Sequence, residues 1–227
     1  TLVEGLKAQG LFSQIDAVLT GYIGDHELGH LVMETLQQIR AENPDCLYCC
    51  DPVMGDVGRG FFVDEQSIPP FFKDIALKEA DLIVPNQFEA SYLAGMEINN
   101  DDDARAALGR LHALGAKGVV MTSYQPQSLA DDKISMLVSH PDMGIYQVIT
   151  PRLDLDPMPN GAGDVSAATL LGHILNGKPL QDALALTAAA LVDVFYATQQ
   201  ASRRELHLIK AQSAFTDPSK NYTIQRL

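Results

Sequence analysis

The sequence has no tryptophan, only three cysteines and few basic residues. The cysteines lie together at positions 46, 49 and 50, and an odd, clustered set is a poor disulfide framework, so we expect a reducing, cytoplasmic location. Lysine and arginine number 16 against 29 acidic residues among 227, for a net charge of −13. A surface that binds nucleic acid needs clustered basic side chains, so this charge balance argues against such a partner.

Long apolar runs and several common motifs are missing as well. No run of 18 or more apolar residues occurs, so we expect no membrane-spanning segment and no membrane partner. Residues 1–7 lack the basic and apolar regions of a signal peptide, and the absence of an initiator methionine indicates a start within a longer protein. The motifs G-x-x-x-x-G-K-[ST] and G-x-S-x-G are also absent, which argues against a P-loop enzyme and against a serine hydrolase with a nucleophile elbow.

The cysteine spacing still needs an interpretation. Cys46 and Cys49 match C-x-x-C, a spacing used in metal and redox sites. Residues 46–50 are typical of a buried strand, however, and residues three apart on a strand point to opposite faces. We therefore interpret the three thiols as packed core side chains.

Short apolar runs alternate with amphipathic stretches along the chain, and this alternation predicts the fold. Strands followed by helices at this spacing indicate parallel βαβ units in a doubly wound sheet flanked by helices. We expect one domain, residues 1–227, with a β-hairpin inserted at about 133–150. The predicted strands are 15–20, 46–50, 81–84 and 117–122, and the predicted helices are 26–41, with Asp25 as its N-cap, 87–93, 101–114, 165–175, 180–198 and 202–213.

Polar residues follow the predicted strands at their carboxyl ends. They are Thr20–Tyr22, Asp51, Asn86 and Thr122–Ser123. In doubly wound sheets ligands bind beyond these ends, so we expect the four groups to line one site.

The strongest motif is Asn160–Val165, with the sequence N-G-A-G-D-V. Its two glycines allow a tight turn and a close approach to a ligand, and the following helix offers free N–H groups and the positive end of its dipole. Asp164 lies in the first turn, beside this anion site, where a carboxylate can take a proton from a hydroxyl group that attacks phosphorus. A motif this short also fits a helix start that Asp164 merely caps.

Two more carboxylates follow predicted strands. Asp51 begins a loop that contains Pro52 and Gly55, and Glu89 lies at the start of the next predicted helix. Mg²⁺ prefers one or two carboxylates together with water and phosphate oxygens, so these residues are candidate magnesium ligands. Alternatively, Asp51 ends a strand and Glu89 favours a helix N-terminus.

A competing motif lies at His26, Glu27 and His30, which match the H-E-x-x-H pair of zinc proteases. The spacing puts both histidines on one helical face. His26 falls in the first predicted turn, however, and no convincing third ligand follows, because the next histidine is His112. We expect both histidines to be solvated and keep a zinc protease as a remote alternative.

Together these motifs resemble the pyridoxal kinases of the ribokinase-like superfamily. The resemblance covers essentially the whole chain and lies in Thr20–Tyr22, Cys50–Asp56, Pro85–Glu89, Thr122–Ser123 and Gly161–Asp164. The G-x-G-D motif marks the superfamily, whereas Asp-Pro-Val-Met-Gly-Asp and Pro-Asn-Gln-Phe-Glu narrow the resemblance to pyridoxal kinases.

The resemblance implies transfer of a phosphoryl group from ATP to the 5′-hydroxymethyl group of pyridoxal, and of pyridoxine and pyridoxamine. It implies that Asp164 is the base acting on that group and that Tyr22 lies near the pyridine ring. The backbone amides of Gly161, Ala162 and Gly163 would hold the charge on the transferred phosphoryl group.

The resemblance also implies cation and nucleotide sites. Asp51 and Glu89 would organise Mg²⁺ or another divalent cation, partly through water, and family members also use K⁺ and are homodimers. Asp56 and Phe62 would belong to the loop that covers ATP, and the loop through Met158 would lie near the nucleotide. The residues implied to contact the nucleotide are Asp51, Asp56, Val84, Asn86, Glu89, Thr122, Ser123, Thr150, Pro151, Arg152 and Leu153.

The sequence departs from the family at its start. Members of the family begin with a further strand, helix and hairpin, which would precede residue 1 here and which supply several substrate contacts. Two alternatives remain beside the zinc protease. The first is a kinase of the same fold for hydroxymethylpyrimidine or another small alcohol. The second is a non-catalytic protein that binds pyridoxal or nucleotide.

Overall fold

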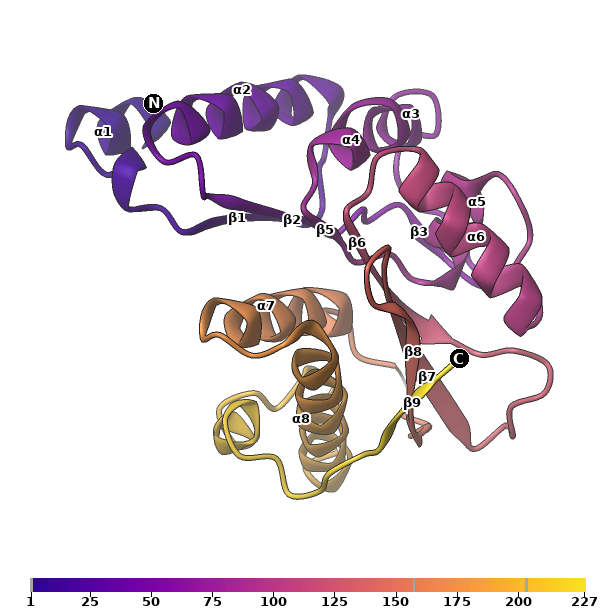
Figure 1. Cartoon of the computed structure of the whole chain (residues 1–227). Helices are drawn as coiled ribbons and strands as arrows, with labels where there is room; N and C mark the ends of the chain where they lie inside the picture. Colours follow the sequence, from indigo (N-terminus) through magenta and orange to yellow (C-terminus); the bar gives the residue numbers. More distant parts are fainter. Residues whose placement is uncertain (1, 157, 203) are drawn as a thin grey trace.

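A computed structural model describes residues 2–156, 158–202 and 204–227 of the chain. Its centre is a sheet of seven strands in the order β1-β2-β5-β6-β7-β8-β9 (Figure 1). The first four strands pair in parallel, and the last three add in antiparallel pairs. The strands of this sheet are β1 Ala17–Thr20, β2 Leu47–Cys50, β5 Leu82–Ile83, β6 Gly118–Tyr124, β7 Lys133–His140, β8 Gly144–Pro151 and β9 Ile224–Arg226.

Helices cover both faces of the sheet, as the doubly wound prediction requires. Figure 1 shows α7 and α8 on one side and α2 to α6 on the other. Two very short strands, β3 Gly55–Asp56 and β4 Gly60–Phe61, form a separate hairpin after β2. The α-helices are α1 Leu2–Ala8, α2 His26–Glu42, α3 Ile68–Phe71, α4 Leu77–Glu79, α5 Gln87–Ala94, α6 Asp101–Ala113, α7 Ala162–Leu175 and α8 Leu180–Gln200, and shorter turns are η1 Phe12–Gln14, η2 Phe72–Ala76 and η3 Gln212–Phe215.

Two hydrophobic cores lie on the two faces of the sheet. One buries Leu36 of α2 and Leu108 of α6 against the sheet, and the other buries Leu170 of α7 and Leu184 of α8. Because alternate residues of a strand face opposite ways, parallel strands covered on both faces are apolar throughout. This explains why the central strands are continuous apolar runs in the sequence.

The cysteines are core residues, as predicted. Cys49 and Cys50 are neighbours on β2 and belong to the two different cores, and Cys46 packs in a third, small cluster. All three are free and buried, and burial raises the pKa of Cys50 to about 12. A thiol this hard to ionise is a poor metal ligand and a poor nucleophile.

Helix α8 is long and apolar enough to cross a membrane, judged by its length and composition alone. Half of the most apolar part of this helix is buried inside the structure, and the side chains of Leu184 and Ala190 are fully buried. The core helix of a globular protein has the same properties, so the apolar character of α8 is explained by packing on the sheet.

The sequence prediction of a helix is wrong in the segment after α8, and the helical segments α1 and α3 to α4 were not predicted. A helix was expected at 202–213, but the described part of this segment forms turns and then η3; Arg203 lies outside the described residues. Ser202 has a left-handed φ of 48°, which a right-handed helix does not accommodate, and Leu208 and Ile209 are exposed rather than packed on one helical face. The chain then returns to the sheet as β9, which was not predicted.

Candidate active site

Three carboxylates gather at the carboxyl ends of the parallel strands. Asp51 follows β2, Glu89 lies in the first turn of α5, and Asp164 lies in the first turn of α7. The charge of Glu89 and that of Asp164 both raise the pKa of Asp51, so the three groups share one electrostatic environment. The fold therefore brings together Asp51, Glu89 and Asp164, three residues that were predicted from the sequence to share one site.

Asp51 is almost completely buried, and one of its oxygens has no partner. Its backbone N–H donates to the Thr20 carbonyl across β1 and β2 at 2.9 Å. The Oδ2 atom accepts no hydrogen bond within the structure, which is costly for a buried carboxylate oxygen. Burial, with the charges of Glu89 and Asp164, raises the pKa of Asp51 to about 8.

Glu89 and Asn86 form a capping box that fixes the neighbouring loop. The Asn86 side chain accepts the Glu89 N–H at 2.9 Å, and Glu89 Oε2 accepts the Asn86 N–H at 2.9 Å. Glu89 Oε1 accepts the Met54 N–H at 2.9 Å, and Asn86 Nδ2 donates to the Gly55 carbonyl at 2.7 Å. Both oxygens of Glu89 are thus engaged by backbone amides, so this residue holds the 54–55 loop beside Asp51.

The start of α7 has the shape expected of an anion site. Gly161 is the N-cap residue with a left-handed φ of 91°, and α7 begins at Ala162. A side chain added at Gly163 would meet Asp51 Oδ2 at 3.5 Å, so the glycine keeps the space above this carboxylate open. Asp164 Oδ1 lies 3.1 Å from the position of a Cβ at Gly21, so its carboxylate faces the loop after β1.

Thr122 and Ser123 lie near the carboxyl end of β6. Thr122 is buried and its N–H donates to the Pro85 carbonyl at 2.8 Å. Ser123 is exposed and has a left-handed φ of 56°, at the point where the register of β6 and β7 shifts. Backbone strain of this kind in a non-glycine residue is concentrated at functional sites.

The remaining predicted residues lie at varied depths. Val84 is a core residue, so only its backbone is available to a ligand. Tyr22 is 60% exposed beyond β1, and Asp56 caps its own hairpin by accepting the Val57 N–H at 2.8 Å. On and after β8, Thr150 is buried, Pro151 and Leu153 are half-buried, and Arg152 is exposed and donates to Gln125 Oε1 at 3.0 Å; Phe62 and Met158 are exposed.

One residue beside the glycine motif was not predicted. The side chain of Leu206 lies 3.9 Å from the position of a Cβ at Gly161, so the segment after α8 reaches the start of α7. The sequence placed Leu206 within a helix and offered no signal for this contact, because it depends on how the chain folds back after α8.

Asp51 fits a divalent cation that takes its remaining ligands from water and phosphate oxygens, since no three described side chains form a metal site by themselves. A bound cation would give the buried Asp51 Oδ2 atom the partner that it lacks. It would also offset the repulsion between the negative charges of Asp51, Glu89 and Asp164. The described chain supplies no lysine or arginine that is hydrogen-bonded to Asp51, Glu89 or Asp164. Beside the cluster, the N–H groups at the start of α7 offer a site for a phosphate group.

The raised pKa values predict how stability depends on pH without metal. Burial, opposed by backbone hydrogen bonds, raises the pKa of Glu89 to about 7, and that of Asp51 is about 8. Between the unfolded pKa near 4 and these values the folded state binds more protons, so stability falls as pH rises. In EDTA, Tm measured by calorimetry should decrease from pH 6.5 to pH 8.

Magnesium provides the control for this prediction. Adding Mg²⁺ should raise Tm more at pH 8 than at pH 6.5, because the cation competes with the protons on the carboxylates. The measurement starts at pH 6.5 because of His173, whose pKa is lowered by burial. At lower pH this histidine makes stability rise with pH, which would mask the fall caused by the carboxylates. A Tm that is constant or rising over this range in EDTA would contradict the proposed electrostatics of the cluster.

The zinc-protease alternative is not supported by the geometry. His26 is the first residue of α2, and both His26 and His30 are exposed, as predicted. Among the described residues no group of three or more histidine, cysteine, aspartate or glutamate side chains is arranged to hold a metal ion. The H-E-x-x-H sequence therefore lacks the third protein ligand that zinc proteases need.

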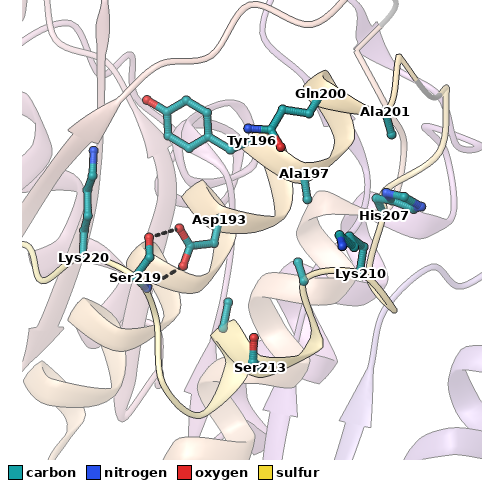
Figure 2. Close-up of a pocket in the computed structure, with 12 residues that line it drawn as sticks. Asp193, Tyr196, Ala197, Gln200, Ala201, His207, Lys210, Ser213, Ser219 and Lys220 are labelled. Atoms are coloured by element: carbon teal, nitrogen blue, oxygen red, sulfur yellow. Dashed lines mark hydrogen bonds between the residues drawn. The ribbon is translucent and has the colours of Figure 1, made fainter.

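A groove of about 570 Å³ lies away from the carboxylates, between α8 and the chain that follows it (Figure 2). Asp193 on α8 accepts hydrogen bonds from the backbone and the hydroxyl group of Ser219, and Lys220 Nζ lies 5.8 Å from the ring centre of Tyr196. These contacts fasten the C-terminal segment to α8, and none of the predicted site residues lines the groove.

Comparison with known proteins identifies relatives of the chain. The family model described as phosphomethylpyrimidine kinase matches residues 7–205. The chain is 39% identical over 227 residues to the pyridoxal kinase PdxY of Rubrobacter xylanophilus, an alignment that covers 100% of this chain and 77% of that protein. It is 34% identical to the pyridoxal kinase PdxY of Corynebacterium diphtheriae, covering 100% of this chain and 78% of that protein.

The fold is shared with solved structures as well. It is similar to the pyridoxal kinase of Leishmania donovani in complex with ADP and pyridoxamine, with a TM-score of 0.89 and 29% identity. That comparison covers 100% of this chain and 79% of the other. The predicted α/β fold, with its mostly parallel, doubly wound portion and inserted hairpin, is thereby confirmed.

Proposed function

The chain belongs to the family of phosphomethylpyrimidine and pyridoxal kinases, and we propose that it transfers the γ-phosphate of ATP to the 5′-hydroxymethyl group of pyridoxal, pyridoxine or pyridoxamine. The observation that carries this proposal is the position of Asp164. Its carboxylate lies in the first turn of α7, directly after the glycines, and faces the loop after β1. A base and an anion site are thus adjacent, as phosphoryl transfer requires.

In the proposed reaction Asp164 accepts the proton of the hydroxymethyl group as its oxygen attacks the γ-phosphorus. The bond from phosphorus to the bridging oxygen breaks, and ADP leaves with the electron pair. The N–H groups of Gly161, Ala162 and Gly163 stabilise the charge on the transferred group, because they are fixed at a helix start before the substrate arrives. Tyr22, exposed beyond β1, is proposed to contact the pyridine ring.

Asp51 is the residue proposed to bind Mg²⁺, which supplies charge neutralisation on the phosphates when bound. Its free, buried Oδ2 supports this role, whereas the two oxygens of Glu89 are held by backbone amides. We therefore propose that Glu89 acts mainly by positioning the 54–55 loop, with any contact to the cation through water. Asn86, Thr122 and Ser123 at the neighbouring strand ends are proposed nucleotide contacts.

The rest of the proposal follows the family resemblance. Residues 1–227 act as one kinase domain, Thr150–Leu153 and the backbone of Val84 lie near the nucleotide, and the hairpin with Asp56 and Phe62 covers ATP. K⁺ is a second cation, the active form is a homodimer, and the protein is cytoplasmic. Replacement of K⁺ by Na⁺ in the kinase assay tests the need for K⁺. Light scattering on the purified full-length protein tests whether it is a homodimer.

A substrate panel tests the function. Full-length protein with Mg²⁺ and ATP is assayed for ADP formation with pyridoxal, pyridoxine, pyridoxamine, hydroxymethylpyrimidine and ribose. We expect the largest kcat/KM for one of the three pyridine alcohols. Phosphorylation of the pyrimidine or the sugar but not of any pyridine alcohol would assign the chain to another kinase of the same fold, and ligand binding without any ADP formation would indicate a binding protein.

A further inference from the structure

His26 and His30 form a close pair on the exposed side of α2, outside the kinase site. They are four residues apart on the helix, and their Nε2 atoms are 2.9 Å apart. Neither residue belongs to the carboxylate cluster or to the proposed nucleotide contacts. The pair is thus a feature of the H-E-x-x-H sequence that the kinase function does not use.

The two imidazole rings meet at their Nε2 edges. An end-to-end hydrogen bond between two imidazole rings would separate their centres by about 5 Å, since each nitrogen lies about 1 Å from its ring centre. The ring centres here are only 4.2 Å apart, with the ring planes at 73°. The two rings therefore meet at an angle rather than end to end, with their Nε2 atoms at the near edges and within hydrogen-bonding distance of each other.

The separation of the nitrogens indicates the kind of ion that fits. Two nitrogens bound at about 2.0–2.1 Å are about 2.9 Å apart when they subtend a right angle, and about 3.3 Å apart in a tetrahedron. The observed 2.9 Å equals the right-angle value, and it is also the length of the hydrogen bond that the two rings form without an ion. The right angle is that of square-planar and octahedral ions, such as Cu²⁺ and Ni²⁺, rather than that of tetrahedral Zn²⁺.

The surroundings hold the pair in place and leave room for water ligands. The ring of His30 packs edge-on against Phe71, and a side chain at Gly29 would meet the same Phe71 ring at 2.8 Å, so α2 is pressed against it. His26 lines a groove of about 380 Å³ together with Phe71, Asp74 and other residues. The first turn of α2 is fixed by Asp25, which accepts the Leu28 N–H.

We propose that His26 and His30 form a two-histidine site for Cu²⁺ or Ni²⁺, completed by water molecules. Each ring binds through Nε2 and carries its proton on Nδ1. The negative net charge of the chain, −13, favours the approach of a cation. The site is separate from the magnesium position at Asp51 and needs no third protein ligand, in contrast to the zinc site of a protease.

The test is Ni²⁺ titration of the full-length, tag-free protein by isothermal titration calorimetry, in excess Mg²⁺ so that the carboxylate cluster is filled. We expect one Ni²⁺ per chain. His26→Gln and His30→Gln should each weaken binding about tenfold or more, because each leaves a single ligand and loses the chelate. The matched control is His140→Gln, which removes a half-buried histidine from the hairpin and should leave Ni²⁺ affinity unchanged.

Three further results decide the proposal. Unchanged kinase activity of His26→Gln and His30→Gln with Mg²⁺ alone would support a site separate from the active site. Equal Ni²⁺ affinity in wild-type and His30→Gln protein, or no binding by either, would overturn it and leave the pair as a hydrogen bond. Tighter binding of Zn²⁺ than of both Cu²⁺ and Ni²⁺ would also overturn it, because the geometry would then be tetrahedral.

Discussion

Asp164→Asn is expected to lower kcat by about 100- to 10,000-fold, the usual loss when a general base is removed. Asparagine has nearly the same shape and can still accept hydrogen bonds, but it cannot take the proton of the attacking hydroxyl group. The glycine N–H groups and Asp51 remain, so the Kd for ADP should change by less than about tenfold. The measurements are steady-state turnover with pyridoxal and calorimetric titration with ADP.

The matched control for this variant is Asp182→Asn. Asp182 is also an exposed aspartate in the first turn of a long helix, α8, but it lies away from the carboxylate cluster. Both variants lose one favourable charge near a helix N-terminus, which costs stability by similar small amounts. If turnover of Asp164→Asn stays within a few-fold of that of Asp182→Asn, the role of Asp164 as base is refuted.

Asp51→Asn should change activity and stability in opposite directions. Asp51 Oδ2 is the one buried carboxylate oxygen without a partner among the described residues, and its loss should reduce kcat/KM at least about 100-fold. In EDTA, however, the variant should be more stable than wild type at pH 8, because folding no longer places a third charge beside Glu89 and Asp164. The Tm difference, about 2–4 °C for each kcal/mol in a chain of this size, should shrink as pH falls to 6.

Asp81→Asn provides the contrasting control. Asp81 lies directly before β5, at the opposite edge of the sheet from Asp51. Arg40 and Lys117 pair with its carboxylate at 2.6 Å each and lower its pKa despite partial burial. Its loss should reduce Tm and leave the pyridoxal KM unchanged. A wild-type chain at least as stable as Asp51→Asn at pH 8 in EDTA would show that Asp51 is not an uncompensated charge.

Much of this architecture is encoded locally in the sequence. Asp25 was recognisable as a cap because a short polar side chain precedes an apolar periodic segment, and it accepts the expected Leu28 N–H. Asn86 has the same kind of side chain directly before α5 and accepts the Glu89 N–H, although no cap was predicted there. The strand ends were equally visible, since Asp51 directly follows a continuous apolar run. The placement of the carboxylates at one edge then follows from parallel pairing alone.

The features that sequence reasoning missed depend on tertiary contacts. Glu89 was expected to bind the cation, but only the folded loop shows that Met54 and Asn86 donate to its two oxygens. The contact of Leu206 with Gly161 and the return of the chain as β9 depend on the path after α8, where propensity alone favoured a helix. In these cases long-range packing overrides local preference.

The most direct measurement is a crystal structure of the full-length protein with Mg²⁺, ADP and pyridoxal. We expect the β-phosphate of ADP to face the amides of Gly161–Gly163 across the position of the transferred group, and the cation at Asp51, at about 2.0–2.1 Å or through one water molecule. The pyridoxal hydroxymethyl group should lie within hydrogen-bonding distance of Asp164. Nucleotide bound in the groove of Tyr196 and Lys220 instead, or an Asp164 turned away from the substrate, would contradict the assignment.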